Sequence, residues 1–131
     1  MLTIAELRRI AKARLDDAEA LLHTRRYDGA VYLCGYAVEL ALKARICKTL
    51  RWEGFPETVG EFRDLQSFRI HDLEALLHLS GIENRVKDQF VAQWSSVSEW
   101  DPEMRYARVG TTGRQAASVM VEHVKVLLRQ L

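Results

Sequence analysis

The sequence predicts an all-α fold, an up-and-down bundle of four to five helices forming one domain over residues 1–131. Apolar residues recur at helical spacing along most of the chain, and no segment shows the clean alternation of a strand. The only two prolines, Pro56 and Pro102, fall in stretches that look like loops. One long segment is apolar around nearly its whole circumference, which is typical of a buried central helix.

Composition sets broad limits on the function. Hydrophobic residues make up 48% of the 131 residues and charged residues 28%, which is ordinary for a globular domain. The net charge of +1 does not require a polyanionic partner. No apolar run reaches the roughly 18–20 residues of a membrane span, and the N-terminus lacks a signal-peptide pattern, so we expect a cytoplasmic protein. Cys34 and Cys47 lie too far apart on one predicted helix for a disulfide, and we expect buried thiols.

The first helix is predicted from Ile4 to His23. Thr3 and Glu6 form a capping box, in which each side chain satisfies a free backbone amide at the helix start. The second helix is predicted from Asp28, a suitable N-cap, to Leu50. It is the nearly all-apolar one, and Gly35 within it indicates a neighbour that packs very close.

The second half of the chain is predicted to hold shorter elements. Residues 51–68 form a long connection, and a short helix follows over residues 71–79. Ser80 and Glu83 form a second capping box before a helix that ends near residue 99.

The last helix is predicted to begin at Thr112 as N-cap, after a second connection over residues 100–113. Most neighbouring helices should be antiparallel.

Residues 13–45 read ARLDDAEALLHTRRYDGAVYLCGYAVELALKAR, and this stretch resembles the first two helices of HEPN domains. Two weaker pieces follow in the same order as in that family: His71-Asp72-Leu73 opening a short helix, and Arg105-Tyr106 before the last helix. The resemblance implies a helical bundle that commonly forms a homodimer. It also implies a nucleotidyltransferase-type partner, often within a toxin–antitoxin pair, and in many members a metal-independent ribonuclease.

The ribonuclease motif of the family is an Arg, four to six residues and then a His. Here eight residues separate Arg114 from His123, and seven separate Arg63 from His71. Arg105 has no His within six residues downstream. A chain without the motif is more typical of a binding or partner subunit.

The first candidate site is a polar stripe on the second predicted helix. Tyr32, Tyr36, Glu39 and Lys43 share one face of a helix that is otherwise apolar. Burying a carboxylate and an ammonium is costly unless they are paired. The stripe therefore predicts a ligand groove or a symmetric dimer interface. The alternative is an internal Glu39–Lys43 pair at a rim, with both tyrosines pointing outward.

The second candidate site precedes the last helix, where Arg105, Tyr106, Arg108, Thr112 and Arg114 cluster around a Gly-Thr-Thr-Gly stretch. Arginine forks and a helix N-terminus both suit a phosphate group. The alternative is a capped helix with solvated arginines.

Two histidines are the last candidate site residues. His71 could act as a general acid or base, with Arg105 stabilising phosphate charge, whereas His123 lies on the apolar stripe of the last helix. No histidine or cysteine spacing predicts a metal site, and no cofactor is expected.

The leading hypothesis is a HEPN-like binding or regulatory subunit that dimerises and partners a nucleotidyltransferase-type protein or binds nucleotide or RNA phosphate. The first rival is a ribonuclease, which requires an Arg and a His converging in one cleft. The second rival is a purely structural dimerisation module.

Overall fold

The computed structural model describes residues 1–131, and its helical content confirms the all-α class. None of its helices combines the length and the apolar character that crossing a membrane requires. The elements are, in order, β1 (Leu2–Thr3), α1 (Ile4–His23), α2 (Tyr27–Leu50), β2 (Gly54–Phe55), the 3₁₀ helix η1 (Gln66–Phe68), α3 (Leu73–Leu79), α4 (Glu83–Gln89), α5 (Val91–Val97), the 3₁₀ helix η2 (Pro102–Tyr106) and α6 (Arg114–Gln130).

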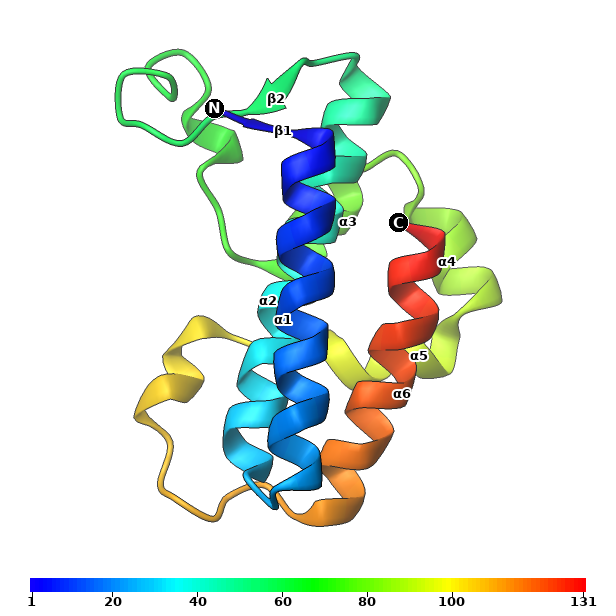
Figure 1. Ribbon diagram of the computed structural model, residues 1–131. Coiled ribbons are helices and arrows are strands. Elements are labelled where there is room, and N and C mark those ends of the chain that lie inside the picture. Colours follow the sequence, from blue (N-terminus) through cyan, green and yellow to red (C-terminus); the bar gives the residue numbers. More distant parts are fainter.

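The bundle is organised around α2. The long helices α1 and α2 pack along each other, and α6 packs against both (Figure 1). Of the short helices, α3 packs on α2 and α5 packs on α6. The result is one continuous apolar core that draws side chains from all of these elements.

The two long helices match the sequence-based expectations closely. The α1 helix has the predicted bounds, and both hydrogen bonds of the Thr3–Glu6 capping box are present. In α2, the predicted close neighbour at Gly35 is the indole of Trp100: a Cβ added at Gly35 would lie 1.9 Å from this ring. Cys34 and Cys47 are buried free thiols, as expected.

Two predicted N-caps are wrong for a shared reason. Asp28 lies inside the first turn of α2, whose N-cap is Arg26, and α6 is preceded by Gly113 rather than by Thr112. The Asp28 carboxylate instead accepts hydrogen bonds from the backbone amides of Gly110 at 2.7 Å and Thr112 at 2.8 Å. A long-range contact has thus replaced both expected local caps.

The predicted helix over residues 83–99 is divided into α4 and α5, because Phe90 leaves the helical region with φ −128° and ψ 41°. The second capping box is also absent. The Ser80 hydroxyl is buried and donates to the carbonyl of Leu77, while Glu83 pairs with His78 and Lys87. This division brings the number of α-helices to six.

The connection after α2 holds an unpredicted strand. The antiparallel pairing of β1 with β2 joins Leu2 to Phe55 and Thr3 to Gly54. Gly54 permits this approach, because a Cβ there would lie 2.6 Å from the carbonyl oxygen of Leu2. Two paired residues are too few to produce a visible alternation in the sequence. The loop ends before α3, whose N-cap Asp72 accepts from the amide of Ala75.

Candidate functional site

The polar stripe of α2 contains a buried carboxylate. Glu39 is only 3% exposed. Its Oε1 accepts hydrogen bonds from Nζ of Lys43 at 2.7 Å and from Nδ1 of His71 at 2.8 Å. Its Oε2 is buried and has no hydrogen-bond partner. The Glu39–Lys43 pair of the alternative interpretation therefore exists, and it extends to a histidine that the sequence analysis did not connect to it.

The Glu39 contact fixes the orientation of His71. An imidazole nitrogen facing a carboxylate carries the proton, so Nδ1–H donates to Glu39 and Nε2 remains available to a ligand. The His71 side chain is 62% exposed even though its partner is buried. A histidine held by a carboxylate from behind and open in front has the arrangement of a general acid, a general base or an anion ligand.

His71 lines a pocket of about 580 Å³ together with Tyr36 and Arg105. Tyr36 comes from α2, His71 and Asp72 precede α3, and the remaining wall is the segment 98–105. The structure thus places Tyr36 of the first candidate site and Arg105 of the second at the same pocket. Arg105 and His71, the two residues of the ribonuclease hypothesis, both line it.

Aromatic contacts shape one side of this pocket. The ring of Tyr36 meets Trp100 edge-on at 4.9 Å between centroids, and the hydroxyls of Tyr32 and Tyr36 lie 3.3 Å apart. Trp100 donates its indole N–H to the carbonyl of Tyr32 at 3.1 Å. The hydrogen bond with Tyr32, followed by burial, raises the pKa of Tyr36 to about 12. Tyr36 is therefore a neutral hydroxyl group at physiological pH.

Arg105 supplies permanent positive charge. The phenol of Tyr106, followed by that of Tyr32, raises the pKa of its guanidinium. The guanidinium carbon lies 4.7 Å from the ring centroid of Tyr106, and Nη1 donates to the carbonyl of Pro102. Carboxylates also line the pocket, namely Asp72, Glu99, Asp101 and Glu103.

A second hollow of about 310 Å³ lies on the other side of His71. Its walls include Lys43, Leu40 and Phe55, and Nζ of Lys43 lies 5.3 Å from the centroid of the Phe55 ring. Since His71 lines both, its side chain lies between the mostly polar pocket and the more apolar hollow.

The N-terminal part of the chain matches a protein-family model. Residues 4–60 match the family model of the HEPN domain. The match confirms the resemblance expected from the sequence. No curated protein and no solved structure matches the chain significantly. The HEPN match supports a nucleotide- or RNA-related or regulatory role in general, and HEPN domains commonly dimerise.

The HEPN match includes Tyr32, Tyr36, Glu39 and Lys43 but ends before His71 and Arg105. The part of the pocket built by residues 71–105 therefore lies outside the matched region.

The other residues of the second candidate site lie outside this pocket. Arg108, Thr112 and Arg114 do not line it. The Asp28 carboxylate already accepts from the amide of Thr112, so that amide is not free for a phosphate group. The hydrogen bonds from Gly110 and then Thr112 lower the pKa of Asp28, which keeps the carboxylate charged.

The remaining histidine candidate lies elsewhere. Nδ1 of His123 contacts the hydroxyl of Ser96, which joins α6 to α5. The structure contains no group of three or more His, Cys, Asp or Glu residues suited to a metal ion.

Sequence reasoning missed the His71–Glu39 contact, because nothing periodic links a loop residue to a position on a helix far back in the chain. It also missed the pocket role of Trp100 and of the acidic residues from 99 to 103. The one signal for Trp100 was Gly35, which indicated a close neighbour without naming it.

Proposed function

We propose that this chain is a HEPN-type binding or regulatory subunit that takes a nucleotide, or one nucleotide of an RNA chain, in the pocket lined by Tyr36, His71 and Arg105. One observation carries the proposal: buried Glu39 holds His71 at the mouth of a pocket that also receives an arginine and an aromatic ring.

The chemistry of the pocket suits a ligand with one anionic group. Arg105 pairs with a phosphate, since a guanidinium fork matches phosphate oxygens, and Nε2 of His71 donates to the phosphate when the imidazole carries both protons. Tyr36 offers an aromatic surface to a base. The four carboxylates accept hydrogen bonds from amino and hydroxyl groups but repel further negative charge. A nucleoside monophosphate therefore fits better than a triphosphate.

Calorimetric titration with AMP and ATP tests this proposal. AMP should bind more tightly than ATP, and Arg105→Ala should weaken AMP binding by about tenfold or more, because a charge-assisted hydrogen bond contributes roughly 1.5–3 kcal/mol. Arg63→Ala, a change at an exposed arginine outside the pocket, is the control. Absence of AMP binding, or equal losses in both variants, would contradict the proposal.

A ribonuclease is the second candidate, because His71 and Arg105 line one pocket. In that case His71 would move a proton as general acid or base, and Arg105 would stabilise the charge that develops on phosphate. Labelled RNA should be incubated without metal with the wild type, His71→Ala and Arg105→Ala. Cleavage by the wild type that both substitutions abolish would replace the binding proposal with the enzyme.

We further propose a homodimer formed around the segment that follows the pocket. Met104, Tyr106 and Val109 are exposed apolar side chains on this one segment, and Val109 is 100% exposed. Sedimentation should show a dimer that Val109→Glu dissociates, while Val59→Glu, at an exposed valine elsewhere, leaves it intact. A dimer that binds no nucleotide would instead support a structural dimerisation module.

The proposed partner is a nucleotidyltransferase-type protein, as in a toxin–antitoxin pair. The HEPN match supports this class of partner without identifying one. An adjacent reading frame encoding such a protein, and its co-purification with this chain, are the observations to seek.

A further inference from the structure

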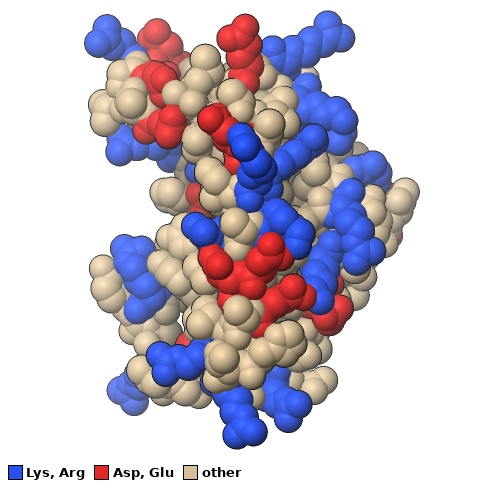
Figure 2. Space-filling view, viewed as in Figure 1, with Lys and Arg blue, Asp and Glu red and all other residues tan.

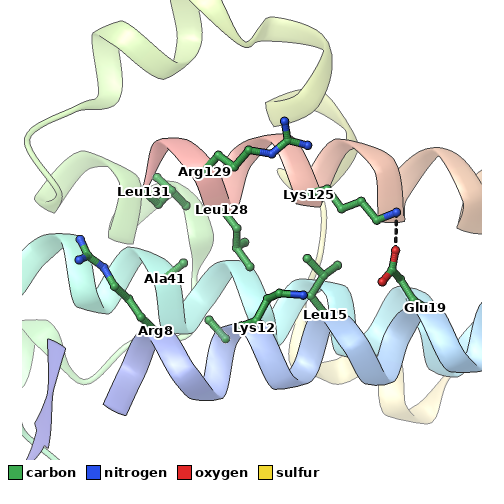
Figure 3. A pocket seen from close by; sticks show the side chains of 10 residues that line it. Arg8, Lys12, Leu15, Glu19, Ala41, Lys125, Leu128, Arg129 and Leu131 are labelled. Atoms are coloured by element: carbon green, nitrogen blue, oxygen red, sulfur yellow. Dashed lines mark ion pairs between the residues drawn. The ribbon is translucent and has the colours of Figure 1, made fainter. Parts of the chain in front are cut away.

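A groove between α1 and α6 shares no lining residue with the His71 pocket (Figure 3). Its volume is about 360 Å³. Apolar side chains form its floor, and these are Ala11, Leu15, Ala41, Leu128 and Leu131. The floor is recessed, because Ala11 is 2% exposed and Leu15 is 4% exposed.

Basic side chains edge the groove. Lys12 pairs with Asp16, and Lys125 pairs with Glu19 and Glu122. Arg8 and Arg129 line the same groove but form no salt bridge. Figure 2 shows Lys and Arg side chains gathered between the upper part of α1 and the C-terminal half of α6, with acidic side chains below them. The positive charge is therefore concentrated at one end.

A further arginine extends this positive end. Nε of Arg45 is buried and has no hydrogen-bond partner. Burial, followed by the charges of Arg85 and Arg8, lowers the pKa of Arg45. Arg85 uses its guanidinium on the carbonyl of Gln130, at 2.9 Å. Arg45 and Arg85 line a neighbouring hollow that also contains Glu83, and neither arginine forms a salt bridge.

We propose that this groove binds an amphipathic helix of a partner protein, with its apolar residues on the floor and its carboxylates against Arg8 and Arg129. Residues 8–19 of α1 span roughly 16 Å at 1.5 Å per residue, which matches about three turns of a docked helix. An apolar floor with charged edges is the usual setting for helix-in-groove recognition. The unbalanced arginines select acidic residues at one end of that helix.

The lining argues against two other occupants. No aromatic side chain lines the groove, so a single-stranded nucleic acid would find no stacking surface there. A membrane surface requires apolar side chains that protrude, whereas Ala11 and Leu15 lie at the bottom between two helices.

Two fluorescein-labelled helical peptides of about 14 residues test the proposal. Both carry leucines at positions i, i+4 and i+7, and they differ only in having glutamates or lysines beside these leucines. Fluorescence anisotropy should show the acidic peptide binding at least about tenfold more tightly than the basic one. The double substitution Arg8→Glu/Arg129→Glu should reverse this order, and Arg9→Glu, on the exposed side of α1, should not.

A second variant tests the floor. Leu128→Asn should weaken both peptides, while circular dichroism reports whether the variants remain folded. No binding of the acidic peptide at about 100 µM, equal binding of the two peptides, or equal effects of the charge reversal and Arg9→Glu would overturn the proposal. Displacement of the acidic peptide by an RNA oligonucleotide or by anionic vesicles would also overturn it.

Discussion

The carboxylate of Glu39 on α2 accepts a hydrogen bond from Nδ1 of His71, at 2.8 Å, and joins the segment before α3 to the central helix. The same oxygen accepts from Lys43 at 2.7 Å. Glu39 is buried, whereas His71 is mostly exposed. The contact therefore links the packing of the core directly to the orientation of a side chain at the pocket.

Removal of the Glu39 carboxylate should be strongly destabilising. Glu39→Ala leaves the ammonium of Lys43, whose side chain is 14% exposed, without its partner. We expect a loss of about 3 kcal/mol in the free energy of unfolding, measured by urea denaturation. The double substitution Glu39→Met/Lys43→Met should recover most of this loss, since an apolar pair of similar volume avoids burying charge.

The matched control for this experiment is Asp16→Ala. It removes an i, i+4 pair with Lys12 in which both side chains are more than half exposed. An exposed pair on a helix is worth only roughly 0.3–0.5 kcal/mol. Losses of similar size at both positions would show that the buried pair contributes no more than a surface one.

Gly35→Ala should destabilise the protein by about 2 kcal/mol, although alanine is normally the better helix former. The added Cβ would fall 1.9 Å from the Trp100 ring and force the indole out of its place. Gly60→Ala is the control, because the nearest atom to an added Cβ there is 3.9 Å away. Thermal unfolding and Trp fluorescence measure both variants, and an unchanged melting temperature for Gly35→Ala would contradict the close packing.

Asp28→Ala should release the loop before α6. The amides of Gly110 and Thr112 lose their acceptor, so their hydrogen exchange should accelerate, while Asp17→Ala leaves them protected. Acidic pH should also release this loop. The pKa of Asp28 is lowered from 3.8, so its contribution is present above that value and is lost as the pH falls through the lower folded-state pKa. Slow exchange of both amides in Asp28→Ala would disprove this role.

Alkaline pH should destabilise the aromatic wall of the pocket. The pKa of Tyr36 is raised from 10.0 to about 12, so the folded state favours the protonated phenol. This contribution is complete below pH 10 and disappears as the pH rises through about 12. In an absorbance titration, Tyr32→Phe should move the Tyr36 transition to lower pH, because it removes the main cause of the shift. Tyr27→Phe is the control, and a transition that stays in place in Tyr32→Phe would refute the assignment.

Local patterns predicted the helices well and their ends less well. The Thr3–Glu6 box fixed the start of α1, since both partners lie within one helical turn. The Ser80–Glu83 box failed because the Ser80 hydroxyl is buried and bonds to Leu77 instead. A capping motif describes only what neighbouring residues offer each other. It contains no information about burial or competing partners.

The sequence by itself determined that the chain is a helical bundle around a buried α2 and that α2 carries Tyr36, Glu39 and Lys43 on one face, because helical periodicity is a local property. Only the tertiary structure decided what this face does. It brought His71 to Glu39 and Arg105 to the same pocket, and it assigned Asp28 to the loop before α6. These contacts join residues far apart in the chain, and they depend on how the helices pack rather than on any spacing in the sequence.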